Sequence, residues 1–217
     1  MFSRVGVCLP KGGSSEHSAV AFNHGNTAKM VIFGGWNGAY HTNELAVLST
    51  DAPGAASSDG WEWEPLKVTG RGPSPRSGHT ATPLDDNGSS MLVFGGEYAT
   101  VGRKYYATAD ILECSTLTWR PLETEDFVPE PRMGHSLTFV EAIGGALLFG
   151  GEDAVASFND VAVFETCVRA WRPLQLSGMS PLPRAGHSAT LVSPSRLYVF
   201  GGRSRARADA GARAPEF

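Results

Sequence analysis

Short apolar runs that end in Gly-Gly recur four times along the chain. They cover residues 30–33, 91–94, 146–149 and 197–200. The first glycines stand at positions 34, 95, 150 and 201, so the intervals are 61, 55 and 51 residues. Runs this short, rich in β-branched and aromatic residues and bounded by Gly, Pro and Ser, are typical of β-strands. No window of eleven or more residues shows a helical period, so the pattern predicts repeated small sheets.

Two further signals accompany these runs, one at all four and the other at the first three. A histidine precedes it: His17 stands alone, whereas His79, His135 and His187 lie within Pro-Arg-x-Gly-His. A tryptophan follows each of the first three Gly-Gly pairs, in the form of Trp63, Trp119 and Trp171. Each unit therefore predicts four strands: the first begins at the histidine, the second ends at Gly-Gly, the third follows a polar loop, and the fourth carries the tryptophan. Four-stranded sheets bury both faces when they stack around an axis, which is a β-propeller.

These motifs resemble the kelch-repeat family, over about residues 15 to 202. The WD-repeat propeller is the nearest alternative, but its period is about 40–45 residues, shorter than the intervals here. None of the tryptophans is followed by Asp. The resemblance implies an all-β fold, a kelch-type β-propeller of about four blades or an open fragment of a larger propeller, with three complete repeats and the start of a fourth.

The repeat divides the chain into six segments: 1–16, a linker with a possible fourth strand at 2–7; 17–66, 67–122 and 123–174, complete repeats; 175–202, a partial repeat; and 203–217, an Arg- and Ala-rich tail that we expect to be disordered. Residues 2–7 could complete the last blade and close a four-bladed ring. Otherwise the chain is an open arc, which we favour. An open arc leaves apolar faces bare, so we expect self-association or docking to further blades.

Composition narrows the class of protein. Hydrophobic residues make up 41% of the chain and charged residues 18%, which excludes a disordered chain. The net charge of −4 argues against a nucleic-acid binder with a broad basic surface. No apolar run approaches the roughly 20 residues of a membrane span. Three cysteines are too few for a disulfide scaffold, so we expect a cytoplasmic protein without nucleic-acid or membrane partners.

The repeated residues have structural explanations, and we expect no metal, no cofactor and no catalytic residue. Symmetry-related histidines on separate blades do not converge as metal ligands must. We expect each instead to hydrogen-bond backbone near the start of its own blade, and His41 to be exposed in a loop. The structural set is Gly34, Gly35, Gly95, Gly96, Gly150, Gly151, Gly201, Gly202, His79, His135, His187, Trp63, Trp119 and Trp171.

One face of the propeller gathers charged and aromatic side chains. Strands alternate in direction, so the loops between second and third strands share a face with the linkers that precede first strands. The candidate partner-binding residues there are Trp36, Tyr40, Arg76, Glu97, Tyr98, Arg132, Glu152, Asp153 and Arg184. Since loops on a rigid scaffold commonly carry binding residues, we expect a non-catalytic protein-interaction scaffold or adaptor. The alternative is a small-ligand binder or enzyme with a site at the central channel.

Overall fold

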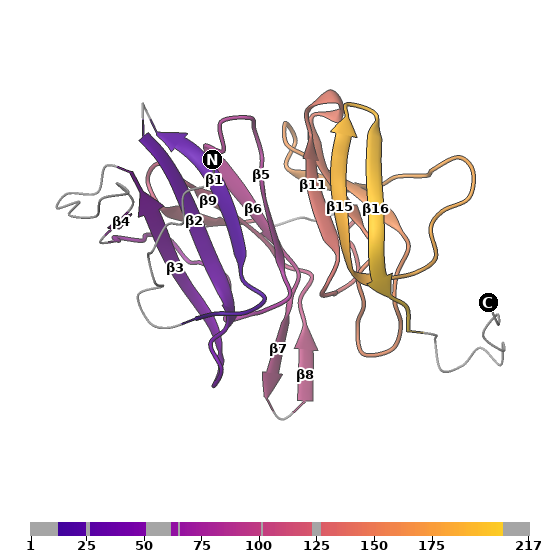
Figure 1. Ribbon diagram of the computed structural model, residues 1–217, viewed down its shortest axis with the longest axis horizontal. Helices are drawn as coiled ribbons and strands as arrows, with labels where there is room; N and C mark the ends of the chain where they lie inside the picture. The colour runs from indigo at the N-terminus through magenta and orange to yellow at the C-terminus, as the bar shows by residue number, and fades with distance from the viewer. Residues whose placement is uncertain are drawn as a thin grey trace, which may run out of the picture.

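The computed structural model describes residues 13–24, 27–50, 62–64, 66–100, 102–122 and 127–205. Within these ranges the chain forms 16 strands and a single short 3-10 helix, Glu141–Ile143 (Figure 1). Nearly all the strands belong to antiparallel sheets built from consecutive stretches of sequence. The all-β class predicted from the repeat is therefore confirmed. No helix in the described ranges is long and apolar enough to cross a membrane.

Three of the sheets are complete four-stranded blades. Blade I has the order β1 (Ser18–His24), β2 (Thr27–Trp36), β3 (His41–Ser49) and β4 (Glu62–Trp63). Blade II has β5 (Thr80–Pro83), β6 (Ser90–Phe94), β9 (Ala109–Glu113) and β10 (Thr118–Pro121). Blade III has β11 (Ser136–Val140), β12 (Gly145–Phe149), β13 (Val161–Glu165) and β14 (Ala170–Pro173). Each blade lies within one sequence repeat.

The blades pack face to face. Side chains alternate between the two sides of each strand, so a blade between two others contributes side chains to both junctions. The phenylalanine that ends a second strand faces the next blade, where it meets that blade's fourth-strand tryptophan. Phe33 packs against Trp119 with ring centroids 5.1 Å apart, and Phe94 against Trp171 at 4.8 Å. Both phenylalanines are fully buried, and each lies in one of the two hydrophobic clusters between blades.

Blade IV has two strands among the described residues, β15 (Ala185–Ser193) and β16 (Arg196–Arg203). Their burial alternates between half-buried and exposed along most of both strands. One side packs on blade III, and the other presents Phe200, which is 82% exposed. Arg203, which the sequence assigned to the tail, is the last residue of β16. The candidate strand at 2–7 and the tail from 206 lie outside the described residues, which form an open arc.

A hairpin inserted in blade II was not expected from the sequence. Strands β7 (Glu97–Thr100) and β8 (Gly102–Tyr105) pair with each other between β6 and β9. Figure 1 shows the hairpin projecting beyond the end of its own blade. It enlarges the side of the arc on which the sequence placed the partner-binding residues.

Candidate protein-interaction face

The repeated histidines join neighbouring blades. In each case the Nε2 atom bonds a hydroxyl at the first strand of the preceding blade: Ser18 to His79 at 2.8 Å, Thr80 to His135 at 2.7 Å, and Ser136 to His187 at 3.0 Å. The expectation that these rings bind backbone of their own blade was therefore wrong. Burial lowers the pKa of His79 to about 3 and places the pKa of His135 well below its ordinary value. Both rings are therefore in the neutral form at physiological pH, not in the imidazolium form that serves as a general acid.

The Gly-Gly pairs lie in the same junctions. Gly34 has a φ of +67°, and a Cβ there would come within 2.9 Å of the His79 ring. The next residue, Gly35, donates its N–H to the carbonyl of Arg76 in blade II at 2.8 Å. Only glycine fits this left-handed backbone at such close approach, which explains why the pair recurs.

The arginines of Pro-Arg-x-Gly-His are structural, which corrects their assignment to a partner-binding surface. Arg76 is 1% exposed and Arg132 is 0% exposed. Arg132 donates to the carbonyl oxygens of Glu130 and Gly150 at 2.9 Å each, and it pairs with both carboxylate oxygens of Asp160. Its guanidinium also lies 4.3 Å from the centre of the Phe158 ring. No atom of these two side chains is available to a partner.

Arg184 makes the same backbone contacts in blade IV, but its side chain is more exposed than those of Arg76 and Arg132. It donates to the carbonyl oxygens of Leu182 and Gly201 at 3.0 and 2.9 Å. Its side chain is half-buried because no further blade covers it among the described residues. The three arginines thus share one task, which is to tie the start of a blade to that blade's own Gly-Gly turn.

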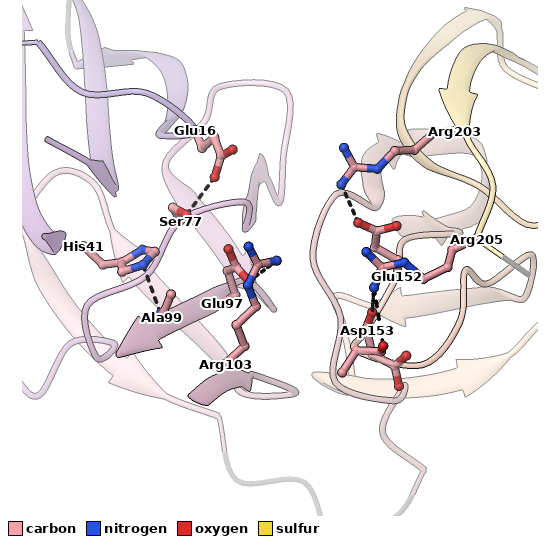
Figure 2. A network of polar contacts seen from close by, with 11 residues as sticks. Glu16, His41, Ser77, Glu97, Ala99, Arg103, Glu152, Asp153, Arg203 and Arg205 are labelled. Carbon is pink, nitrogen blue, oxygen red and sulfur yellow. Dashed lines mark hydrogen bonds and ion pairs between the residues drawn. The ribbon is translucent and has the colours of Figure 1, made fainter. Parts of the chain in front are cut away.

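The loops between second and third strands form one surface, here called the loop face. It comprises residues 36–40, 97–100, 102–105, 152–156 and 203–205. Figure 2 shows its polar contacts, with Glu97 and Arg103 on one side and Glu152, Asp153, Arg203 and Arg205 on the other. Arg203 donates to Glu152 Oε1 at 2.5 Å, and Arg103 lies 3.5 Å from Glu97 Oε2. These arginines are 71% and 56% exposed, whereas their carboxylate partners are almost fully buried.

An aromatic stack fixes the other side of the loop face. The ring of His41 lies 4.9 Å from that of Trp36 and 5.3 Å from that of Tyr98. His41 Nε2 also accepts the backbone N–H of Ala99 at 3.0 Å, which ties the hairpin of blade II to blade I (Figure 2). His41 is 6% exposed, so the expectation that it lies free in a loop was wrong.

The predicted partner-binding residues therefore separate by burial. Arg76, Arg132, Glu97 and Glu152 are buried and do not form an exposed surface. Tyr40 is 58% exposed, and Trp36, Tyr98, Asp153 and Arg184 are half-buried. The sequence missed the exposed cations Arg103 and Lys104, which β8 carries. Gly102, a turn residue between segments that contain Tyr98 and Tyr105, is the signal that could have indicated this hairpin.

The central channel contains a hollow of about 310 Å³. It is lined by Glu16, His17, Gly78, His79, Met133, Gly134, His135, Glu152, Ala185, Gly186, His187 and Arg203. Three of its four histidines already use Nε2 in the bonds between blades. In the part of the chain that the structure describes, no group of three or more His, Cys, Asp or Glu side chains could hold a metal ion.

Comparison with known proteins gives consistent matches. The model for the KLHDC2/KLHL20/DRC7 Kelch-repeats domain matches residues 9–202. Acyl-CoA-binding domain-containing protein 4 of Arabidopsis thaliana is 32% identical over 147 residues, which is 67% of this chain and 21% of that protein. Human Kelch domain-containing protein 3 is 29% identical over 196 residues, 87% of this chain and 48% of that protein. Rab9 effector protein with kelch motifs from Xenopus laevis is 28% identical over 146 residues, 64% of this chain and 38% of that protein.

The chain spans about a fifth to a half of the length of these relatives. The family model, in contrast, covers every blade that the structure describes. With four Gly-Gly turns, the histidine joints and the tryptophans of three complete blades, the chain belongs to the kelch-repeat family.

Proposed function

We propose that this chain is a non-catalytic protein-interaction module that binds a partner protein through the loop face. The observation that carries the proposal is the combination of exposed Tyr40, Arg103 and Arg203 on loops held by buried joints. Tyrosine and arginine are enriched among residues that dominate binding energy. The stack of Trp36, His41 and Tyr98 holds two of these loops in place, which lowers the entropy lost on binding.

A catalytic function has less support. The low pKa values of His79 and His135 make these rings weak bases, their Nε2 atoms are engaged between blades, and no metal-holding group of side chains occurs among the described residues. Kelch-repeat proteins generally mediate protein interactions, and one relative is named a Rab9 effector. By analogy, we place this chain among adaptors or scaffolds of the cytoplasm. Cys114 and Cys167 are free thiols, as a reducing compartment favours.

The test is affinity purification from cells with quantitative mass spectrometry. The double variant Y40A/R103A removes an exposed aromatic and an exposed cation from the loop face. A matched control is V168A/R169A, which removes an exposed apolar residue and an exposed arginine from the turn between β13 and β14. Proteins that the wild type and the control retain, and that Y40A/R103A loses, would support the loop face as the binding surface. Equal retention by all three would contradict the proposal.

A further inference from the structure

The two ends of the arc expose two halves of one interface. Inside the chain, each blade presents a side that carries its second-strand phenylalanine and Gly-Gly, here called the trailing face. It packs against the side of the next blade that carries the first-strand histidine, here called the leading face. This junction occurs three times, between blades I and II, II and III, and III and IV. Its repetition specifies what kind of surface fits the bare trailing face of blade IV.

The phenylalanine is the centre of each junction. Phe33, Phe94 and Phe149 are at most 2% exposed, and each meets the next blade's histidine ring edge to face at 5.1 to 5.4 Å. Phe200 holds the same position in blade IV and is 82% exposed. Tyr198 and Val192 lie on the same side and are 57% and 64% exposed. A cluster of this kind on an otherwise ordered sheet marks an interaction surface.

The backbone repeats as regularly as the side chains. The second glycine donates to the carbonyl that opens the next blade, each time at 2.8 Å: Gly35 to Arg76, Gly96 to Arg132 and Gly151 to Arg184. The first glycine has no space for a Cβ at Gly34, Gly95 or Gly150, because the next blade lies against it. At Gly201 no atom lies within 4 Å of such a Cβ. Blade IV thus has the backbone shape of a junction without its second half.

A line of amide bonds runs along the inner edge of the arc. Gly186 donates to Gly134 at 2.8 Å, Gly134 to Gly78 at 2.9 Å, and Gly78 to the carbonyl of Glu16 at 3.2 Å. The next bond in this series would be accepted by the carbonyl of Gly186. That bond requires an N–H donor from a residue with a positive φ, as at Gly78, Gly134 and Gly186. Glu16, at the opposite end of the arc, has that conformation, with a φ of 55° against 63° at Gly78.

The leading face of blade I matches the exposed trailing face. His17 is exposed, and its Nδ1–H donates to the carbonyl of Ser14 at 2.8 Å. With Nδ1 as the donor to Ser14, Nε2 is the ring atom left for a hydroxyl bond like those of His79 and His135. Ala19 and Ala21 are also exposed on this side, whereas Ala81, the counterpart of Ala19 in blade II, packs into the core of its junction. A hollow of about 530 Å³ beside Ala21 and Met30 is lined by both apolar and polar residues, Lys29 and Asn87 among them.

We propose that the trailing face of blade IV binds the leading face of blade I of a second copy of this chain. Phe200 then packs on His17 of the second copy, and the Ser188 hydroxyl donates to Nε2 of that ring. The N–H of Glu16 donates to the Gly186 carbonyl, and the N–H of Gly202 to the Ser14 carbonyl. Each contact reproduces one that the chain already makes three times within itself.

A second copy is favoured as the occupant for two reasons. Its leading face offers the histidine and backbone donor in the required arrangement, so no other chemistry has to be assumed. Human Kelch domain-containing protein 3 is matched over 48% of its length, so two copies of this arc are together about as long as that single protein. The proposal goes beyond the binding of a partner through the loop face, which lies on a different surface and stays open in the assembly.

The test is sedimentation velocity of the pure chain from submicromolar to high micromolar concentration. The wild type is expected to associate. F200D alters the trailing face and A19R the leading face, and both residues are exposed, so neither change removes packing from the fold. Each variant alone is expected to associate at least about tenfold more weakly. V168D, at a residue 63% exposed on the turn between β13 and β14, is the matched control and is expected to associate as the wild type does.

Mixing supplies the decisive result. F200D keeps an intact leading face, and A19R keeps an intact trailing face, so an equimolar mixture is expected to form a complex of two chains through one junction. A wild type that stays monomeric throughout the range would overturn the proposal, because another segment of the chain would then cover Phe200. Association that F200D leaves unchanged, or a mixture that remains monomeric, would overturn it as well. Y40A/R103A is expected to associate normally, which keeps this test separate from that of the loop face.

Discussion

Replacing Arg132 by methionine tests whether the repeated arginine is structural. Methionine retains much of the length and apolar volume of the side chain but has no donors. The variant leaves the carbonyl of Gly150 without the Arg132 donor inside the junction between blades III and IV. The carbonyl of Glu130 and the carboxylate of Asp160 are partly exposed, so water can replace the arginine there. The contact with Phe158 is also lost.

The magnitude follows from these contacts. A buried carbonyl without a donor costs about 1–3 kcal/mol, and loss of a cation–π contact adds about 0.5–1 kcal/mol. R132M is therefore expected to lower the free energy of unfolding by about 1.5–4 kcal/mol. At Arg184 the equivalent bonds to Leu182 and Gly201 are exposed, so water restores them and R184M is expected to lose at most about 1 kcal/mol.

The assay is urea unfolding at low protein concentration, followed by the fluorescence of the buried tryptophans Trp119 and Trp171. R184M is the matched control, since the motif and the substitution are the same and only the cover differs. If R132M fails to fold while R184M folds, the result also shows that R132M loses more stability than R184M. Equal losses for the two variants would refute the structural reasoning. A stable R132M that no longer retains partner proteins would show that Arg132 binds a partner after all.

Two further predictions concern the joints between blades. Because the folded-state pKa values of His79 and His135 lie below 6.5, the unfolded chain binds more protons between pH 6.5 and about pH 3, and stability falls as the pH drops through that window. In urea melts from pH 7 to pH 5, H135N is expected to reduce this slope by up to about 1.4 kcal/mol per pH unit; a flat wild-type profile would contradict this. G150A and G201A share the cost of a left-handed alanine, about 1–2 kcal/mol, but a Cβ at Gly150 also comes within 2.7 Å of the Arg184 carbonyl. G150A is therefore expected to melt at a lower temperature than G201A, and the reverse order of melting temperatures would be inconsistent with the open end of blade IV. In sedimentation, G201A is expected to self-associate more weakly than the wild type.

The repeated architecture could be predicted because its signals are local. A strand that ends in Gly-Gly and a tryptophan on the fourth strand each reflect the needs of one short segment, and they recur where the structure has blades. The pairing of β7 with β8 carried a weaker signal of the same kind. Gly102 is a turn residue, but the residues around it do not alternate between apolar and polar, and residues 100–102 do not spell a common two-residue hairpin turn.

The candidate site was harder to predict because exposure depends on distant segments. Charged residues usually lie on the surface, so Arg76 and Glu97 were expected to be exposed. Nothing near them in the sequence indicates that they are buried. Arg76 is buried because the carbonyl of Gly95 and the ring of Tyr106 receive its guanidinium. His41 is buried because a hairpin from the next blade covers it. Arg76 is thus buried by distant residues of its own repeat and His41 by residues of the next repeat, and the sequence next to each residue contains neither contact.

The junction between blades has a direction, because a phenylalanine on one side always meets a histidine on the other. Two identical trailing faces are not complementary, so this junction does not pair with itself in the isologous manner of most dimers. The assembly proposed above is therefore built from heterologous contacts, and the rotation between successive copies determines the product. If two arcs complete a full turn, they form a closed ring with cyclic symmetry; if the turn is incomplete or offset along the axis, the same junction extends into a helical filament. A change in blade curvature of a few degrees could thus convert a discrete particle into a polymer without altering any residue at the contact.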